Sequence, residues 1–332
     1  MLAPTNEPTS LLKETADNPL PEHASAGMLT LRDGKRVRYG YFGATGRPLK
    51  GTVVIFAGRN ECIEKYFETI RDLAARGFGT AMFDWRGQGG SDRMIRRTDR
   101  GYVRSFDDYV QDIEPFFQDV ILPDCRAPFY LLGHSTGALI ALLAHRQLAI
   151  RVKRMVLSAP LLEFEDLPFS MVGTRRLTGL LRMLGLGGML MSGRDKDGWP
   201  ASFASNKLTS DPDRYRRNLG IYEAHPELGT GKPTVGWVHA ACKAALKVQE
   251  PEFTDRLRVP SLFVAAGEDE VVSTPMIEAF GRYLRGASVV TIDGARHELM
   301  QERDVYRDQF WAAFDAFIPG SEKPIEAAQL SG

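Results

Sequence analysis

Three residues that lie far apart in the sequence could together form a reactive nucleophile. Ser135 stands in the segment Gly133-His134-Ser135-Thr136-Gly137, where the apolar run before it is typical of a buried strand and the apolar run after it of a helix. A sharp strand-to-helix turn strains the backbone at its apex and leaves little room beside it, so glycines fit two residues away on either side. This setting predicts a serine hydroxyl that attacks a carbonyl carbon. The alternative is a serine that caps the helix, with glycines that allow close packing.

A serine hydroxyl needs a base to activate it near neutral pH, and the base needs a carboxylate to orient it. In a sheet of this kind both follow the serine along the chain, the acid before the histidine, in loops after late strands. His297 has this position, because it follows an apolar run at 287–294 and precedes a helical pattern. The other five histidines lie elsewhere: His23 in the N-terminal segment, His134 in the serine turn, His145 in the following helix, and His225 and His239 in a later insertion. His297 is therefore the predicted base.

The predicted acid lies where the apolar run 260–267 ends. Three carboxylates follow this run, and Asp269 is favoured because Val271 and Val272 would hold the loop against the core. Glu268 and Glu270 are the alternatives, and a merely solvated acidic loop is the other interpretation.

Acyl transfer also requires hydrogen-bond donors for the oxyanion that develops on the substrate. One predicted donor is the backbone N–H of Thr136, next to the nucleophile. The other is the backbone N–H of Arg59, in the loop after the apolar run 51–58, where Gly58 permits a tight path. The Arg59 side chain would face either solvent or a substrate head group.

The elements that must position these residues can be recognised from hydrophobic patterns. An Asp33-Gly34 turn signal joins the segments 28–32 and 35–43 into a predicted hairpin. Six near-continuous apolar runs follow, as expected for strands covered on both faces, at 51–58, 79–85, 129–135, 154–160, 260–267 and 287–294. Helical patterns lie between them, such as 65–77, where Gly77 is the expected end. The predicted fold is α/β, a mostly parallel, doubly wound sheet of eight strands.

The alternation of strands and helices fails between residues 161 and 247, which are rich in Leu, Met, Gly and Arg. This predicts a helical cap inserted into a core that comprises 26–160 and 248–320, with a loose N-terminal segment at 1–25 and a tail at 321–332. Four glycines argue against one rigid helix in the cap, namely Gly179, Gly185, Gly187 and Gly188.

The cap would cover Ser135, because it leaves the sheet at the edge where the carboxyl ends of the strands lie. One interpretation is an ordinary lid that packs on the core. The other is an acyl-chain tunnel whose mouth touches a membrane, where Leu and Met insert and Arg175, Arg176 and Arg182 meet phosphate. The candidate substrate-binding residues are Gly58, His134, Phe169, Trp199 and Trp237, although core packing explains the aromatic ones equally well.

The amino-acid composition limits the classes of protein to which this chain can belong. The chain has 332 residues, and its 42 Lys+Arg balance its 42 Asp+Glu, so no net charge attracts nucleic acid. Three cysteines without metal-like spacing favour a reducing compartment. No signal peptide and no apolar run of about 20 residues is evident. We expect a cytoplasmic protein, with the cap as the candidate for peripheral contact with the inner membrane face. The sequence predicts no oligomeric state.

No metal or cofactor is expected. There is no His-Glu-x-x-His pattern or other metal cluster. A dinucleotide fingerprint that began at Gly87 and Gly89 would need a glycine where Asp92 stands.

Four segments, "FAGRNECIEKY", "FDWRGQGGSDR", "GHSTG" and "GARHELMQERD", resemble the α/β-hydrolase superfamily, and within it the monoacylglycerol lipase and bacterial lysophospholipase branch. The resemblance spans roughly residues 29–318. Many relatives have His-Gly where this chain has Ala57-Gly58, and the variant here is similar to the bacterial lysophospholipase group. The resemblance implies a nucleophile, base, acid and oxyanion amides at the positions chosen above. It also implies that residues 84–89 form a structural corner.

The predicted function is a serine hydrolase that cleaves carboxylic esters through an acyl-enzyme, most simply a lysophospholipase or monoacylglycerol lipase whose partner is a single-chain lipid ester. A general carboxylesterase, an aminopeptidase and a cofactor-free haloperoxidase are the alternatives, because one fold supports many reactions. A non-catalytic binding protein is the remote alternative, since all three triad positions are filled.

Overall fold

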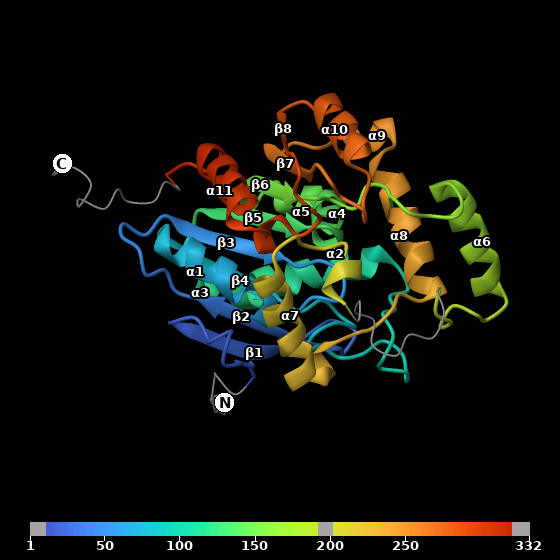
Figure 1. Ribbon diagram of the computed structural model, residues 1–332, viewed down its shortest axis with the longest axis horizontal. Coiled ribbons are helices and arrows are strands. Elements are labelled where there is room, and N and C mark those ends of the chain that lie inside the picture. The colour runs from blue at the N-terminus through green and yellow to red at the C-terminus, as the bar shows by residue number, and fades with distance from the viewer. Residues whose placement is uncertain (1–10, 192–201, 321–332) are drawn as a thin grey trace.

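An eight-stranded, mostly parallel sheet forms the centre of the computed structural model, which describes residues 11–191 and 202–320 (Figure 1). Its strands are Ala24–Thr30 (β1), Arg36–Phe42 (β2), Gly51–Phe56 (β3), Phe78–Phe83 (β4), Phe129–His134 (β5), Val152–Ser158 (β6), Ser261–Ala266 (β7) and Ala287–Ile292 (β8). Their order across the sheet is β1-β2-β4-β3-β5-β6-β7-β8. The pairs β1–β2 and β2–β4 are antiparallel and the others are parallel, which confirms the predicted fold class.

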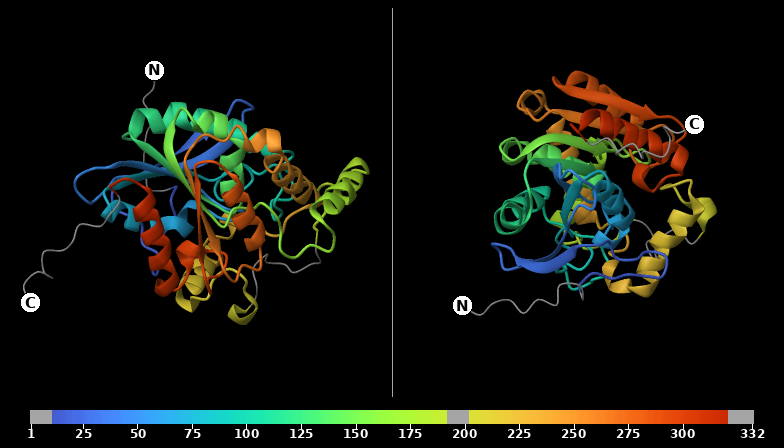
Figure 2. Two further views of the ribbon diagram at one scale, coloured as in Figure 1. Left: turned by 90° about the horizontal axis from the view of Figure 1, so that it is seen from above. Right: turned by 90° about the vertical axis from the view of Figure 1, so that its left-hand side faces the viewer.

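Helices cover both faces of this sheet (Figure 2). The α-helices are Phe67–Ala75 (α1), Phe106–Phe116 (α2), Leu122–Asp124 (α3), Thr136–Leu143 (α4), His145–Leu148 (α5), Met171–Met183 (α6), Pro212–Ala224 (α7), Val235–Val248 (α8), Pro251–Thr254 (α9), Thr274–Tyr283 (α10) and Asp304–Phe317 (α11). A π-turn spans Phe117–Ile121 (η2), and short 3₁₀ turns span Ile63–Tyr66 (η1), Phe203–Ser205 (η3), Pro226–Leu228 (η4) and Leu299–Gln301 (η5).

Alternation along the strands decides which helix each side chain meets. In β3, Val53 and Ile55 pack in the cluster that contains residues of α1 and α11. Val54 and Phe56 pack in the cluster that contains residues of α2, α4 and α8. Successive side chains of a strand point to opposite faces, so a wholly apolar strand requires cover on both sides.

Two expectations about the margins of the core are wrong. Residues 11–25 are not loose, because Leu12 is buried, the Asn18 side chain donates a 2.9 Å hydrogen bond to the Glu64 carbonyl oxygen, and β1 already begins at Ala24. The strand β8 is not covered on both faces. It lies at the edge of the sheet, and the side chains of Ser288 and Val290 are exposed. Residues 1–10 and the predicted tail at 321–332 lie outside the described residues.

The cap segment, residues 161–247, enters the chain between β6 and β7 and contains α6, α7 and α8. Helix α6 projects from the body of the molecule beside α8, as Figures 1 and 2 show. It continues through Gly179, where a Cβ would lie 3.1 Å from the His239 ring, so glycine lets α6 approach α8. Helix α6 ends just before Gly185, whose φ of 79° favours glycine. None of the helices within the described ranges is both long and apolar enough to cross a membrane.

Candidate active site

The three side chains predicted to react meet at the carboxyl ends of three parallel strands of the sheet. Ser135 follows β5, Asp269 follows β7 and His297 follows β8. His297 Nε2 lies 3.0 Å from Ser135 Oγ, and His297 Nδ1 lies 2.8 Å from Asp269 Oδ2. All three residues are buried. With its proton on Nδ1, the imidazole donates to the carboxylate and accepts from the hydroxyl, which is the arrangement that activates a serine.

The backbone at Ser135 is strained, with φ 50° and ψ −114°. The flanking glycines are required by close packing. A Cβ on Gly133 would lie 2.9 Å from Ala138 Cα, and one on Gly137 would lie 2.0 Å from the Phe56 carbonyl oxygen. The Ser135 N–H donates to the Ser158 carbonyl oxygen at 2.9 Å, so the neighbouring strand β6 holds the strained turn. The hydroxyl is thereby fixed at the edge of the sheet rather than used as a helix cap.

Asp269 is oriented by its own loop. Its Oδ1 accepts the N–H groups of Val271 and Val272 at 2.8 and 3.0 Å, which leaves Oδ2 for His297. Burial raises the pKa of Asp269. His297 and the two N–H donors lower this pKa by a larger amount, so the net pKa lies below its usual value. Glu268 and Glu270, the two alternatives, are exposed.

The charge on Asp269 acts in turn on the imidazole. Burial lowers the pKa of His297, but the adjacent Asp269 carboxylate more than offsets this effect, and the net pKa lies above its ordinary value. A base with a raised pKa accepts the serine proton more readily, provided that it begins the reaction unprotonated.

Two backbone N–H groups beside Ser135 can bind an oxyanion. Thr136 is the first residue of α4, where N–H groups have no partner within the helix. The Arg59 N–H donates no hydrogen bond within the described part of the chain. Both residues line the same cavity as Ser135.

The loop that carries Arg59 is held by buried charges that the sequence reasoning missed. Glu61 accepts the Gly58 N–H at 2.5 Å, the Tyr66 hydroxyl at 2.6 Å and the Lys65 ammonium at 2.9 Å. Lys65 also reaches Glu298, at 2.5 Å, and Glu298 follows His297 directly. One ammonium group therefore ties the oxyanion loop to the loop of the base. The spacing of Glu61 and Lys65, four residues apart, was the signal that could have indicated this network.

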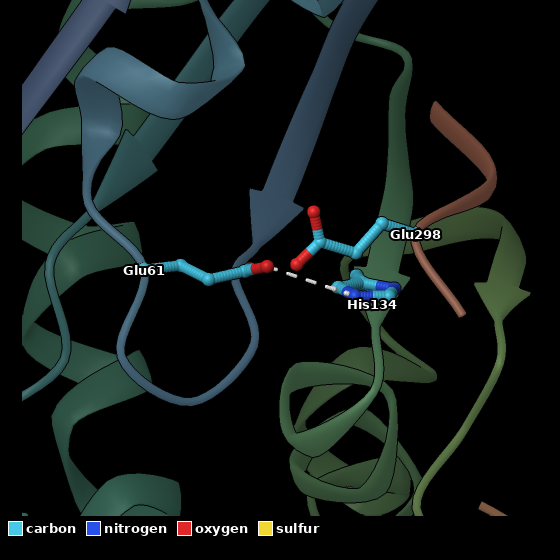
Figure 3. A group of neighbouring side chains, drawn as sticks. All are labelled: Glu61, His134 and Glu298. Atoms are coloured by element: carbon cyan, nitrogen blue, oxygen red, sulfur yellow. Dashed lines mark ion pairs between the residues drawn. The ribbon is translucent and has the colours of Figure 1, made fainter. Parts of the chain in front are cut away.

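The side chains of Glu61, His134 and Glu298 come close together (Figure 3), with potential ligand atoms all within 4.8 Å of one another. The Lys65 ammonium contacts both carboxylates, so each of them already has a cationic partner within the chain. Burial lowers the pKa of His134 to about 4, and the imidazole is neutral at physiological pH. This set of residues fits a structural ion-pair network better than a metal site.

The corner at residues 84–89 supports the same loop. The Trp85 indole donates a 2.9 Å hydrogen bond to the Ala57 carbonyl oxygen, and the Gln88 side chain accepts the Asn60 N–H. The Asn60 side chain in turn accepts the N–H of Thr230, in the cap segment, at 2.7 Å. These contacts are structural, as the resemblance implied.

Ser135 lies on a cavity of about 690 Å³ between the core and the cap segment. Its floor consists of core residues, principally Gly58, Arg59, Ser135, Thr136 and His297. Its roof consists of cap residues and is largely apolar, with Phe164, Leu167, Met191, Leu208 and Trp237 as its principal members.

The predicted substrate-binding residues divide into three groups. Gly58, His134 and Trp237 line the cavity. Phe169 does not, and that prediction is wrong, because its side chain lies before α6 on the surface and is 56% exposed. Trp199 lies outside the described residues.

Comparison with known proteins gives concordant findings. A family model described as serine aminopeptidase, S33 (Hydrolase_4) matches residues 47–304. Lysophospholipase L2 of Escherichia coli (strain K12) is 33% identical over 270 residues, which are 77% of this chain and 76% of that protein.

Two of the solved structures that share this fold are enzymes that act on esters. A thermostable carboxyl esterase from Bacillus coagulans aligns with a TM-score of 0.72 at 18% identity, over 90% of this chain and 98% of that one. A soluble variant of the monoglyceride lipase of Saccharomyces cerevisiae aligns with a TM-score of 0.70 at 18% identity, over 90% of this chain and 97% of that one.

Proposed function

The chain belongs to the serine aminopeptidase S33 family of α/β-hydrolases, and we propose that it is a serine hydrolase that cleaves single-chain lipid esters, either lysophospholipids or monoacylglycerols. The observation that carries the proposal is the line of hydrogen bonds Ser135–His297–Asp269 at the floor of a cavity with an apolar roof. The triad supports ester cleavage, and the roof supports an acyl chain as the bound group.

In the proposed mechanism, Ser135 Oγ attacks the ester carbonyl carbon while His297 Nε2 takes the hydroxyl proton. Asp269 holds the ring and stabilises its charged form. The N–H groups of Arg59 and Thr136 bind the oxyanion. His297 then gives its proton to the departing alcohol, which leaves an acyl-enzyme. Water, deprotonated by His297, attacks this ester, and Ser135 regains its proton as the fatty acid leaves.

The lipid substrate is supported by the names of similar proteins and, independently, by the apolar roof of the cavity. The Escherichia coli relative is named a lysophospholipase, and a structural neighbour of lower identity is named a monoglyceride lipase. The roof side chains of Phe164, Leu167 and Trp237 offer an acyl chain apolar contact that a short acyl group would not use. The family description, serine aminopeptidase, makes aminoacyl amides the alternative substrate to test.

The experiment is a rate comparison across matched substrates: 1-oleoyl lysophosphatidylcholine, 1-oleoylglycerol, p-nitrophenyl acetate and an aminoacyl p-nitroanilide. We expect kcat/KM to be highest for an oleoyl ester. In Ser135→Ala, turnover should fall by several orders of magnitude while circular dichroism stays unchanged. Faster cleavage of the anilide than of the oleoyl esters, or a Ser135→Ala variant that retains turnover, would refute the proposal.

We further propose that the protein is cytoplasmic and that its cap segment touches the inner membrane face. A surface that we call the α6 patch supports this contact. It comprises the exposed apolar side chains of Val172, Leu177, Leu180, Met183, Leu184, Leu186 and Met189. Arg176 on the same helix is exposed and suits anionic lipid phosphates. The three cysteines are free thiols, in keeping with a reducing compartment.

Sedimentation with vesicles of phosphatidylglycerol and phosphatidylcholine tests this contact. The double variant Leu180→Glu/Met183→Glu should bind about tenfold more weakly than the unaltered chain, because two apolar side chains leave the bilayer surface. Ile150→Glu is the matched control. Ile150 is 83% exposed but precedes β6, at the amino ends of the parallel strands, whereas the cap segment leaves the sheet at their carboxyl ends. Equal vesicle binding by all three proteins would exclude the α6 patch as the contact.

A further inference from the structure

We propose that the guanidinium of Arg59 binds the phosphate of the substrate and so selects lysophospholipids over monoacylglycerols. The inference rests on the proposed function, since it concerns the alcohol half of the ester that Ser135 attacks. Arg59 stands on the floor of the cavity, in the loop after β3. Its Nη1 donates a 2.8 Å hydrogen bond to the Gly231 carbonyl oxygen, and its guanidinium carbon lies 5.6 Å from the centre of the Trp237 ring.

Arg59 differs from the other cations that line the cavity in its lack of a carboxylate partner. Lys65 is neutralised by Glu61 and Glu298, and Lys207 lies 3.5 Å from Asp166 and from Glu270. Across residues 11–191 and 202–320, no carboxylate lies within 4.0 Å of a nitrogen of Arg59. A cation removed from bulk water without a counter-charge is costly, and an anionic ligand would offset that cost.

The free edge of the guanidinium suits a phosphate. Nε and Nη2 of Arg59 donate no hydrogen bond within the described residues, yet neither atom is fully buried. These two nitrogens form one side of the planar fork that binds two oxygens of a phosphate at once. Burial lowers the pKa of Arg59 to about 10, with Tyr109, Glu61 and Tyr222 acting in the opposite direction. The group therefore keeps its charge at neutral pH.

The covalent structure of the substrate matches the two roles of this residue. In a lysophospholipid, a short chain of covalent bonds joins the ester carbonyl carbon to phosphorus. In an arginine, a chain of the same number of bonds joins the backbone nitrogen to the guanidinium carbon. The Arg59 N–H faces the oxyanion in the proposed mechanism. The glycerol unit can therefore lie along the Arg59 side chain, with its phosphate at Nε and Nη2, while the acyl chain enters the apolar roof. A monoacylglycerol would leave the guanidinium without an anion.

The test measures a ratio, kcat/KM for 1-oleoyl lysophosphatidylcholine divided by kcat/KM for 1-oleoylglycerol. Arg59→Met should lower this ratio about tenfold or more, because it removes a charged, bidentate contact. Arg59→Lys should give an intermediate ratio, since it keeps the charge without the fork. Lys207→Met, which removes an ion-paired cation of the same cavity, should change the ratio less than about twofold.

A second measurement uses glycerophosphocholine as an inhibitor of 1-oleoylglycerol hydrolysis. Inhibition should be about tenfold weaker in Arg59→Met than in the unaltered chain. Labelling of Ser135 by a fluorophosphonate shows that each variant has folded. Equal loss of both hydrolytic rates, or unchanged inhibition in Arg59→Met, would overturn the role of Arg59 and leave the proposed function standing. If the unaltered chain hydrolyses neither oleoyl ester, the proposed function itself fails.

Discussion

The floor of the cavity comes from loops at the carboxyl ends of the strands, whereas its roof comes from the cap segment between β6 and β7. The floor is held by buried polar contacts, with Lys65 joined to both Glu61 and Glu298. The roof meets the cavity with apolar side chains such as Leu167 and Trp237. We infer that the floor determines whether an ester bond is broken and that the roof determines which acyl chain is accepted. Variants of the triad and of the contacts that hold the oxyanion loop should thus affect every ester, whereas variants of the roof should affect only some.

The largest effect is expected at Asp269. In Asp269→Asn, the amide cannot stabilise the charged imidazole and favours the wrong tautomer, so kcat should fall about 10⁴-fold on oleoyl and acetyl esters alike. Glu268→Gln and Glu270→Gln are matched controls, because both carboxylates are exposed neighbours of Asp269. Their turnover numbers should stay within about twofold of the unaltered chain. A strong loss of turnover in either control would indicate that the altered residue, and not Asp269, is the acid of the triad.

A smaller, equally general loss is expected from Glu61→Gln. The substitution leaves the Lys65 ammonium less well neutralised and weakens the acceptor for the Gly58 N–H. Breaking a buried ion pair should lower the free energy of unfolding by about 3 kcal/mol, measured by urea denaturation. We expect kcat to fall about tenfold on long and short esters alike. Glu227→Gln alters an exposed carboxylate of the cap segment and serves as the control. A loss confined to long-chain esters would contradict the division between floor and roof.

The pH dependence of kcat/KM should reflect the floor alone. His297 accepts a proton only when it is neutral, so activity should rise with pH through the pKa of His297, about tenfold per pH unit on the acid side. Because Asp269 raises that pKa, the midpoint should lie above the usual histidine value of about 6.5 and should shift to lower pH in Asp269→Asn. The midpoint should be the same for oleoyl and acetyl esters. Different midpoints for the two chain lengths would show that a roof group also titrates.

The most selective effect, confined to one class of ester, is expected in the roof. Leu167→Gln should lower kcat/KM for a long-chain p-nitrophenyl ester about tenfold, because a polar amide replaces apolar contact with the acyl chain. Hydrolysis of p-nitrophenyl acetate should change less than twofold. Phe169→Gln is the matched control, because Phe169 lies two residues away and outside the cavity. All substrates are used below their critical micelle concentration, so that binding of the protein to lipid aggregates does not contribute to the measured rates. Equal losses in the two variants would mean that Leu167 is not part of the acyl site.

Much of the floor could be predicted from the sequence because its signals are local. The glycines around Ser135 have a steric requirement that holds wherever a strand turns sharply into a helix. His297 could be chosen because few histidines exist and one follows a late strand. The Glu61–Lys65–Glu298 network could not be predicted in the same way, since Lys65 and Glu298 are 233 residues apart and nothing near either predicts the contact.

The roof was harder to predict because its residues follow no strand periodicity. An aromatic side chain of the cap segment can face the cavity, as Trp237 of α8 does, or the surface, as Phe169 does, and only packing decides. The same limit applied at the margins of the sheet. The apolar pattern of β8 resembles that of a central strand, and its position at the edge depends on the order of the strands in space.

The most direct test of the account is to identify the residue that acts as the nucleophile. The chain is treated with a long-chain alkyl fluorophosphonate, digested and examined by peptide mass spectrometry, beside Ser135→Ala and His297→Ala. We predict a single adduct on Ser135, no adduct in Ser135→Ala, and labelling slowed by several orders of magnitude in His297→Ala. An adduct on another residue, or unimpaired labelling without His297, would contradict the account.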